Sequence, residues 1–290
     1  MHPAHPERRL GIVFIVAASL AWSLGGVFAR ILAMDMATMS LWRAIFATLM
    51  LSAGFIALNR GDTLRRLAAF DWRHFVIAVS GAAAMLAYIG AIAFTTIANI
   101  TILYATGPFI AAGLAWFWIG ERAAPRTILA SAVTLTGVAI MLGGSLGSAS
   151  LLGDTLALVM TATFGFSIVA MKRWGAVDML VTTIASSILT ALLSAPFASL
   201  APPSPRELLL LAGFALASVV LGFFFYVAGA RRLPAAEAGL ISTLEIGLSP
   251  LLVYLLFNEI PTPAGLLGGI VIVGAILWHL IGDLRRERAR

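Results

Sequence analysis

The chain contains no cysteine and has few charged residues. Without cysteine the protein has no disulfide, no thiolate metal site and no cysteine nucleophile. Charged residues make up 11% of the 290 positions, whereas a soluble domain normally carries about 25%. Hydrophobic residues make up 61%, and the mean hydropathy is +1.00. Too little polar surface is present to cover a globule in water, so we expect a lipid bilayer to surround much of the chain.

Histidine is also scarce, and the four that occur lie in the N-terminal tail or near the ends of apolar runs: His2, His5, His74 and His279. The sequence has no His-Glu-x-x-His pattern, no Walker loop and no Gly-x-Gly-x-x-Gly before a strand. These absences argue against a metalloprotease, an ATP-driven pump and a serine-type intramembrane hydrolase. We therefore expect no metal, no cofactor and no enzymatic activity.

Ten apolar stretches are long enough to cross a bilayer, which takes roughly 20 residues per helix. The first follows two arginines but is too long for the apolar region of a signal peptide and has no convincing cleavage site, so we interpret it as a retained span. The stretches lie near residues 10–30, 38–58, 73–94, 98–119, 127–144, 152–171, 179–200, 206–229, 237–257 and 263–282. This pattern predicts an all-α integral membrane protein with ten transmembrane helices.

The basic residues fall almost entirely in alternate loops. With ten helices, sixteen arginine and lysine residues lie on the side of the N-terminus and two on the other side, while Arg43 falls inside a helix. Basic loops mark the cytoplasmic side of a membrane protein. We therefore expect both termini to be cytoplasmic. Because the net charge of +6 resides in these short loops, the membrane accounts for it, and we expect no nucleic-acid partner.

The two halves of the chain are weakly similar to each other. A shift of 138 residues aligns Glu121 with Glu259, and a shift of 142 aligns Arg30 with Lys172. Five helices per half make the second half start on the opposite face, which gives an inverted repeat. Inverted repeats recur in secondary transporters because exchanging the conformations of two similar halves switches access between faces. Gene duplication in a protein without transport activity is the alternative.

Short motifs in both halves carry a family resemblance. They are Ala21-Trp22-Ser23-Leu24-Gly25, Leu41-Trp42-Arg43-Ala44, Tyr104, Gly107-Pro108, Gly120-Glu121, Leu244-Glu245, Ser249-Pro250 and Asn258-Glu259. In order and spacing they resemble the drug/metabolite transporter superfamily, specifically the ten-helix EamA-type exporters, and most of all the bacterial exporters of aromatic amino acids and related metabolites. One departure is that Ile246 follows Glu245 where many relatives have proline, which leaves the position of a bend in the ninth helix open.

The resemblance implies one compact transmembrane domain in the bacterial cytoplasmic (inner) membrane, with EamA-like repeats at residues 1–147 and 148–290. It also implies a central cavity framed by spans 1, 3, 4, 6, 8 and 9, with spans 5 and 10 as packing helices. We expect the protein to be a monomer or a weak homodimer.

Two charged residues lie well away from the ends of the predicted helices. Glu245 is the only acid that the sequence places deep in a span, where an ionisable group should face a cavity or a partner. It would contact a substrate ammonium or carry a coupling proton, or else form a structural hydrogen bond. Arg43 is able to bind a carboxylate through two parallel hydrogen bonds. More often, the side chain of an arginine near the membrane surface extends its charged group to the membrane–water interface. We favour that structural role for Arg43.

Six rings lie within spans, where tyrosine and tryptophan need hydrogen-bond partners that a hydrated cavity supplies. We interpret them as cavity walls, with ordinary packing as the alternative for each: Trp22, Tyr88, Tyr104, Phe164, Tyr226 and Tyr254. Pro108 and Pro250 each remove a backbone hydrogen bond inside a helix and serve as hinges or fixed kinks. We interpret Glu121 and Glu259 as architectural, near the starts of the fifth and tenth spans.

These observations favour a secondary exporter of aromatic or neutral amino acids, or related small metabolites, that works by alternating access. A drug or nucleotide-sugar carrier is the alternative within transport, although a cavity poor in lysine and arginine disfavours phosphorylated solutes. A non-transporting intramembrane enzyme or scaffold is the alternative from another class. A passive channel is less favoured because no ring of like charges is visible.

Overall fold

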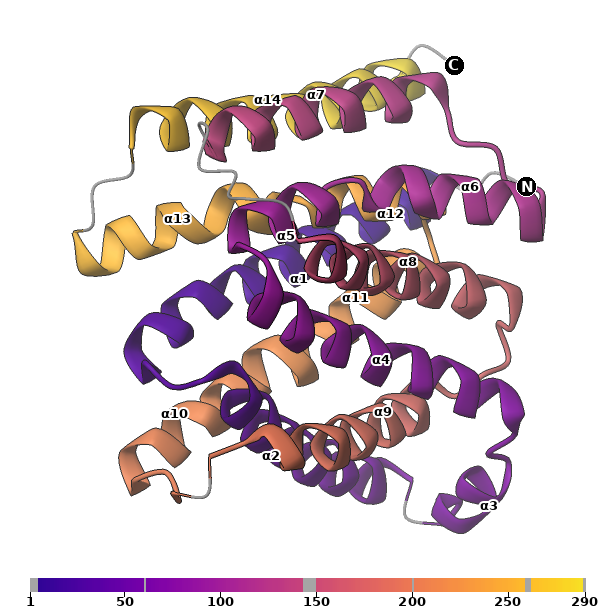
Figure 1. Cartoon of the computed structure of the whole chain (residues 1–290). Helices are drawn as coiled ribbons and strands as arrows, with labels where there is room; N and C mark the ends of the chain where they lie inside the picture. Colours follow the sequence, from indigo (N-terminus) through magenta and orange to yellow (C-terminus); the bar gives the residue numbers. More distant parts are fainter. Residues whose placement is uncertain (1–4, 60, 143–149, 200, 259–261, 289–290) are drawn as a thin grey trace.

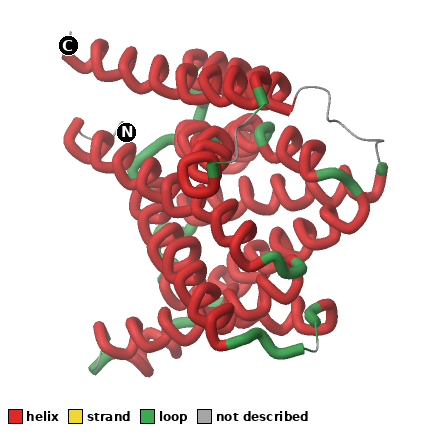
Figure 2. Tube along the Cα trace, turned by 90° about the vertical axis from the view of Figure 1, so that its left-hand side faces the viewer, coloured by secondary structure: helices red, strands yellow, loops and turns green. Residues whose placement is uncertain are grey.

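The computed structural model describes residues 5–59, 61–142, 150–199, 201–258 and 262–288, and within these ranges the chain forms helices and no strand (Figure 2). Ten helical segments of the described chain are long and apolar enough to cross a membrane, which confirms the predicted number of spans. The expected boundary between the repeats at residues 147 and 148 lies outside the described residues.

Some spans are single helices and others are built from two or three consecutive helices. The first half consists of α1 (His5–Leu32), α2 (Met36–Leu58), the short α3 (Thr63–Ala68), α4 (Trp72–Phe94), α5 (Ile97–Tyr104), α6 (Gly107–Ile119) and α7 (Pro125–Leu142). The second half consists of α8 (Leu151–Arg173), α9 (Met179–Ser194) with the 3₁₀ turn η1 (Ala195–Phe197), α10 (Pro205–Ala215), the π-helical turn η2 (Leu216–Leu221), α11 (Gly222–Ala230), α12 (Ala235–Ser242), α13 (Leu244–Phe257) and α14 (Pro263–Arg288).

Polar side chains satisfy the first backbone N–H groups of several helices, and these caps explain where the helices begin. The Asp35 carboxylate accepts from the Thr38 N–H at 2.8 Å and starts α2. Asp71 and His74 form a reciprocal capping box at the start of α4. The side chains of Ser150 and Asp178 accept from the first backbone N–H groups of α8 and α9. The caps place the polar turns at the ends of the bundle and leave the apolar segments between them.

The helices pack in pairs that relate one half of the chain to the other. α7 packs against α14, α2 against α9, and α6 against α12. Each of these three pairs matches a span of the first half with its counterpart in the second. Contacts between other spans also occur as equivalent sets: α4 packs on α8 and α11 on α1, while α6 packs on α8 and α13 on α1. The chain therefore has the predicted two-repeat architecture.

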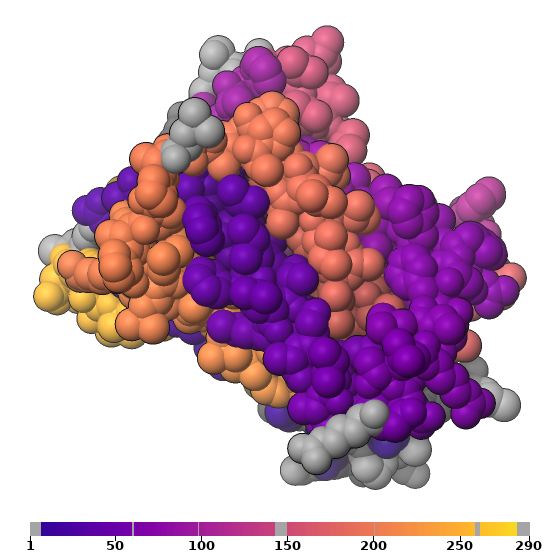
Figure 3. Space-filling model, turned by 90° about the horizontal axis from the view of Figure 1, so that it is seen from below, coloured from indigo at the N-terminus to yellow at the C-terminus, as the bar shows by residue number. Residues whose placement is uncertain are grey.

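The paired helices form three layers (Figure 1). α7 and α14 lie together at the top of this view, α2 and α9 lie at the bottom, and the remaining long helices lie between them. Seen from the α2 and α9 side, segments of the two halves alternate on the surface (Figure 3). The middle layer contains spans 1, 3, 4, 6, 8 and 9, the set that the family resemblance implied would frame the centre, and spans 5 and 10 pack on each other at one edge.

The top pair is held by a close approach between α7 and α14. A Cβ atom added at Gly268 would lie 2.5 Å from the Cα atom of Met141 and would also overlap the carbonyl oxygen of Gly137. Only a residue without a side chain fits here. Small residues permit this kind of backbone contact between membrane helices, where van der Waals packing replaces the hydrophobic effect.

The fourth and ninth spans are interrupted at corresponding positions, which the sequence did not predict. α5 ends at Tyr104 and α6 begins at Gly107, while α12 ends at Ser242 and α13 begins at Leu244. The 138-residue shift that aligns the two halves superposes α5 on α12 at both ends. The interruption is therefore a property of the repeat.

Threonine hydroxyls support both interruptions. Thr106 donates to the Leu103 carbonyl and Thr243 to the Leu240 carbonyl, each at 2.6 Å. These bonds satisfy carbonyls that lose their helical partners where the helix stops. The sequence had suggested Pro108 and Pro250 as the points of bending.

The prolines are not where the helices stop. Pro108 lies in the first turn of α6, immediately after the interruption of the fourth span. Pro250 lies inside α13, which continues through it, seven residues beyond the interruption at Thr243. The first helical turn tolerates proline because its N–H group would have no helical partner there. Pro108 therefore starts a half-helix.

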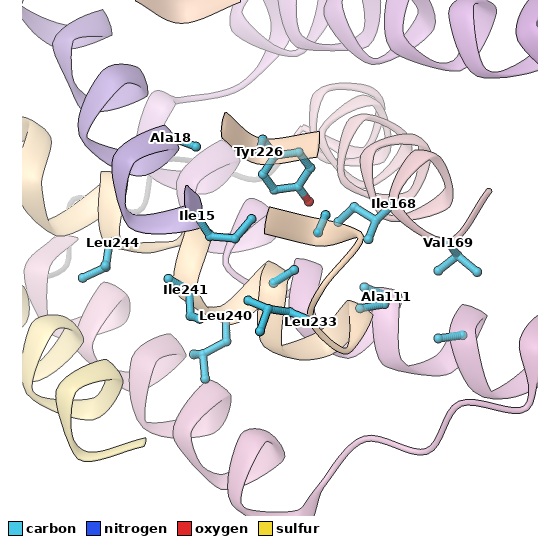
Figure 4. Packing of buried hydrophobic residues seen from close by; sticks show 14 of the residues in the cluster. Ile15, Ala18, Ala111, Ile168, Val169, Tyr226, Leu233, Leu240, Ile241 and Leu244 are labelled. Carbon is cyan, nitrogen blue, oxygen red and sulfur yellow. The ribbon is translucent and has the colours of Figure 1, made fainter. Parts of the chain in front are cut away.

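A buried apolar cluster joins the middle layer (Figure 4). Ile15 on α1, Ile168 on α8, Tyr226 on α11 and Leu240 on α12 are each at most 2% exposed and belong to this cluster. The cluster holds helices of both repeats in contact at the centre of the bundle.

Candidate functional site

Glu245 lies in the first turn of α13, two residues after the interruption at Thr243. Its carboxyl group lies within interaction distance of the side chain of Tyr104, the last residue of α5, which precedes the corresponding interruption in the fourth span. Both side chains are partly exposed rather than sealed. The N-terminal end of a helix favours negative charge, and paired helix interruptions near the middle of the membrane mark binding sites in transporters.

Four aromatic rings from four spans, two in each half of the chain, lie together at this point. The Trp22 ring centroid lies 5.0 Å from that of Tyr226 and 6.2 Å from that of Phe164. Phe164 lies 5.6 Å from Tyr226 and 6.1 Å from Tyr104. These separations fall within the range of about 4.5–7 Å that favours aromatic pairs. The structure thus brings together four of the six rings that the sequence had proposed.

The π-helical turn η2 positions Trp22. The indole Nε1–H of Trp22 donates to the carbonyl of Ser218, inside this turn, at 2.9 Å. A Cβ atom added at Gly222 would lie 2.5 Å from Trp22 Nε1. Wide turns of this kind are frequent at functional sites in helices. Sequence reasoning missed η2, because its residues are as apolar as those of the regular helices on either side.

Tyr226 is more deeply buried than the cavity interpretation expected. Its side chain is 1% exposed, and among the described residues its hydroxyl has no hydrogen-bond partner. Figure 4 shows the hydroxyl on the side of the ring that faces Ile168 of α8. It also lies within electrostatic range of Glu245. A buried hydroxyl without a partner costs about 1–3 kcal/mol. The Tyr226 hydroxyl is therefore an unsatisfied polar group beside the rings of Trp22 and Phe164.

Tyr88 of α4 lies within electrostatic range of both Arg43 of α2 and Glu245 of α13. The Arg43 guanidinium donates from Nη2 toward Met85 Sδ at 3.7 Å and stacks over the Phe214 ring, 5.1 Å from its centroid. Arg43 and Tyr88 are both partly exposed. The site therefore combines an acid, a tyrosine and a cation.

Tyr254 does not join the other rings. Its side chain is 38% exposed on α13, more than two helical turns beyond Glu245 toward the end of that helix. Within the described part of the chain it makes no ring contact with the cluster. The structure thus separates Tyr254 from the four rings that contact one another.

Glu121 joins three segments at the end of the bundle that carries the arginine-rich loops, here called the basic end (loops 61–71, 120–124, 174–178 and 231–234). Its carboxylate pairs with Lys172 at the end of α8 and accepts from the Ala235 N–H at 2.5 Å. Lys172 also donates to the Leu233 carbonyl at 3.0 Å. These contacts agree with an architectural role for Glu121, which ties spans 4, 6 and 9 together. Glu259 lies outside the described residues.

A second buried acid, Glu237, escaped the sequence interpretation. Its residue is 3% exposed in the first turn of α12, where it forms an ion pair with Arg8 of α1. Its Oε1 atom lies 3.4 Å from Nε2 of His279 on α14, a side chain that is 1% exposed. The sequence placed Glu237 at the edge of the ninth span, where acids normally face water. The surrounding run of small residues was the signal that a neighbouring helix packs closely over it.

A surface cavity of about 290 Å³ lies at the basic end, away from the rings. Its charged residues bind one another: Arg66 pairs with Asp178, and His74 Nδ1 lies 2.6 Å from Asp71 Oδ1. Such mutual pairing leaves little charge for a ligand. In the described residues, no group of three histidine, aspartate or glutamate side chains is placed to hold a metal ion.

Comparison with known proteins agrees with this architecture. The sequence matches the EamA-like transporter family over residues 9–143 and again over residues 151–281. It is 28% identical over 295 residues to a protein of Rhizobium johnstonii named riboflavin transporter, with 98% of this chain and 95% of that protein covered.

A solved structure described as a crystal structure of protein matches with a TM-score of 0.83 and 20% identity, and covers 98% of this chain and 99% of that one. This second likeness supports the fold alone. With both halves matching, the chain belongs to the EamA-like transporter family and is a multi-pass membrane transporter built from two repeats.

Proposed function

We propose that this transporter exports an aromatic or neutral amino acid, or a related small metabolite with a planar ring, across the bacterial cytoplasmic membrane. The observation that carries the proposal is the contact between Glu245 and Tyr104, which joins the two helix interruptions beside Trp22 and Phe164. Rings of the solute stack on rings of the protein. The Glu245 carboxylate binds an ammonium group or carries a proton that couples transport to a gradient.

Alternating access follows from the paired architecture. Spans 4 and 9 pack against each other through α6 and α12. Span 4 contributes one interruption and Tyr104, and span 9 contributes one interruption and Glu245. When the repeats exchange conformations, the half-helices on one side of the site move together while those on the other side separate. The site then faces one side of the membrane and afterwards the other.

The ion pairs at the basic end form the barrier on that side. Lys172 with Glu121 and Arg8 with Glu237 connect spans 1, 4, 6 and 9. Opening toward this side requires these contacts to separate. We assign the basic end to the cytoplasm, with both termini there, because arginine-rich loops stay on the cytoplasmic side. On this assignment the barrier must open for the solute to enter from the cell.

A flavin is the second candidate solute. The observation that favours it is the relative named riboflavin transporter, which spans nearly the whole chain. A flavin is a flat three-ring system, and the ring cluster around Trp22 suits it as well as it suits a single ring. The two candidates differ in charge, since a flavin without a phosphate group carries neither an ammonium group nor a carboxylate.

Counterflow in liposomes tests the proposal. Purified protein is reconstituted into vesicles preloaded with unlabelled phenylalanine, leucine or riboflavin, and entry of the labelled solute is followed. We expect uptake above that of empty vesicles for one class of solute. A pH gradient imposed in either direction shows whether a proton is coupled. Failure of every solute to exchange would overturn the proposed function.

The Glu245→Gln variant tests the site in the same vesicles. We expect it to lose most of the counterflow or all response to the pH gradient, because the substitution removes the charge and the titrating group. The matched control is Glu207→Gln, which removes a carboxylate that caps α10 at the far end of its span from the rings. Unchanged transport by the Glu245 variant at every pH would remove this residue from the site.

A further inference from the structure

Arg43 lies about two helical turns inside α2, not at its end. It is the eighth residue of α2, so its Cα atom is about 10 Å from the start of the helix at 1.5 Å per residue. On insertion scales an arginine at the centre of a membrane helix costs about 2.5–3.5 kcal/mol. Such a residue is expected to have a compensating partner or a function.

The contacts of Arg43 provide little compensation. Its guanidinium has five N–H donors, and its described contacts are the weakly accepting Met85 sulfur and the face of the Phe214 ring. No carboxylate among the described residues forms an ion pair with it. The other basic groups near the spans differ, because Arg8 pairs with Glu237 and Lys172 with Glu121.

The contacts of the side chain also lie away from the helix ends. Met85 lies nine residues from the end of α4 and Phe214 nine residues from the start of α10, both counted from the end of the bundle opposite the basic end. Each is thus about 13 Å from the end of its helix, whereas the Arg43 Cα atom is about 10 Å from the start of α2. The structural role that the sequence favoured stays a prediction.

The guanidinium lies close to the solute site. Its ring partner Phe214 lies one helical turn before Ser218, whose carbonyl accepts from Trp22 Nε1 at 2.9 Å. Tyr88 lies within electrostatic range of both Arg43 and Glu245. Arg43 and Glu245 do not form an ion pair, so each retains its capacity to bind a group of opposite charge. Both remain partly exposed inside the bundle. This arrangement presents a cation and an acid to one molecule between them.

We propose that Arg43 is the anion-binding residue of the site and that the transported solute carries an oxyanion beside its ring; this inference rests on the proposed function. Arginine binds carboxylates and phosphates through two parallel hydrogen bonds, which lysine cannot reproduce. The oxyanion is the carboxylate of an amino acid or the phosphate of a flavin nucleotide. An amino acid would place its ammonium group at Glu245 at the same time.

Competition between matched solutes tests the role of Arg43. Phenylalanine is compared with phenylalaninamide, and riboflavin 5′-phosphate with riboflavin, as inhibitors of counterflow. We expect the anionic member of one pair to compete about tenfold or more better, as the loss of a charged hydrogen bond implies. The pair that shows the difference identifies the source of the oxyanion. Equal competition within both pairs, with counterflow intact, would overturn the role of Arg43 but leave the proposed function standing.

Two variants locate the effect. Arg43→Gln should abolish the preference for the anion, and Arg43→Lys should restore only part of it. The control Arg206→Gln removes an exposed arginine at the start of α10 and should keep the full preference. A preference retained by Arg43→Gln would contradict the inference.

A measurement without transport covers the case in which the variants do not reconstitute. Benzoate and benzamide are added to the purified protein in detergent, and the Tm is followed. Benzoate should raise the Tm of the wild type and of Arg206→Gln more than benzamide does. If the two compounds act equally on the wild type, the inference fails, whatever the folding of the variants.

Discussion

Trp22 of α1 and Phe164 of α8 lie 142 positions apart, the same offset that aligns Arg30 with Lys172, and their rings pack edge to face with centroids 6.2 Å apart. Tyr88 and Tyr226 are likewise separated by the 138 residues that align the other helices of the two halves. Trp22 and Phe164 are thus equivalent positions of the two repeats that meet within the bundle. A site built in this way is suited to alternating access, because each half presents a similar surface to the solute.

Removing either member of the ring pair should weaken solute binding. Trp22→Ala and Phe164→Ala should each raise the KM for counterflow about tenfold. The double variant should lose less binding free energy than the two single variants together, because the rings share one contact. A double-mutant cycle should give a coupling of about 0.5–1.5 kcal/mol. Tyr254→Ala is the control and should behave as the wild type. Full additivity would show that the rings act independently.

Gly222→Ala should impair transport through Trp22. The added methyl group would lie 2.5 Å from the indole nitrogen and displace the ring from the Ser218 carbonyl. We expect a several-fold loss of counterflow and a change in the emission maximum of tryptophan fluorescence. The control Gly113→Ala adds the same methyl group where no atom lies within 4 Å. If the two variants transport equally, η2 does not position Trp22.

Glu237→Gln should destabilise the protein strongly. Removing one partner of a buried ion pair costs about 3–5 kcal/mol, and Glu237 and Arg8 have side chains that are 4% and 15% exposed. The Tm in detergent should fall by several degrees. The control Glu7→Gln breaks the exposed pair with Arg232, which should change stability by about 1 kcal/mol or less. Equal Tm values for the two variants would argue against the burial of this pair.

Gly268→Leu should disrupt the pairing of α7 and α14. The new side chain would overlap the backbone of α7 at Gly137 and Met141, and overpacking of this kind costs about 1–3 kcal/mol. The measurement is thermal unfolding in detergent. Gly274→Leu on the same helix is the control, because a Cβ atom there has no neighbour within 4 Å. A Gly268 variant as stable as the Gly274 variant would refute the close packing.

The cap of α4 should make a small pH-dependent contribution to stability. The hydrogen bond with the His74 side chain holds the pKa of Asp71 below its usual value. A lowered folded-state pKa means that the contribution is present above the unfolded-state pKa and is lost as the pH falls through the folded-state pKa. Asp71→Asn should therefore reduce the dependence of Tm on pH below about pH 4. Asp62→Asn is the control, since Asp62 makes no side-chain cap.

Much of the architecture follows from the sequence alone. Lipid requires long apolar helices with every backbone group paired inside them, so the ten spans and their order are visible in composition. The arginine pattern predicted an even number of crossings, and the shifts of 138 and 142 residues predicted two repeats. Glu245 was recognised as a site candidate because a carboxylate within an apolar span is rare enough to identify without a structure.

The arrangement of side chains around the site was decided by the tertiary structure. Tyr226 and Tyr254 occupy similar apolar contexts in the sequence, yet one is 1% exposed and the other 38%. The helix interruptions at Thr106 and Thr243, the π-helical turn at Ser218 and the burial of Glu237 were equally hidden. In lipid the outside of a helix is as apolar as its inside, so hydrophobic periodicity does not reveal which face turns inward. Contacts between distant helices alone determine which side chains meet.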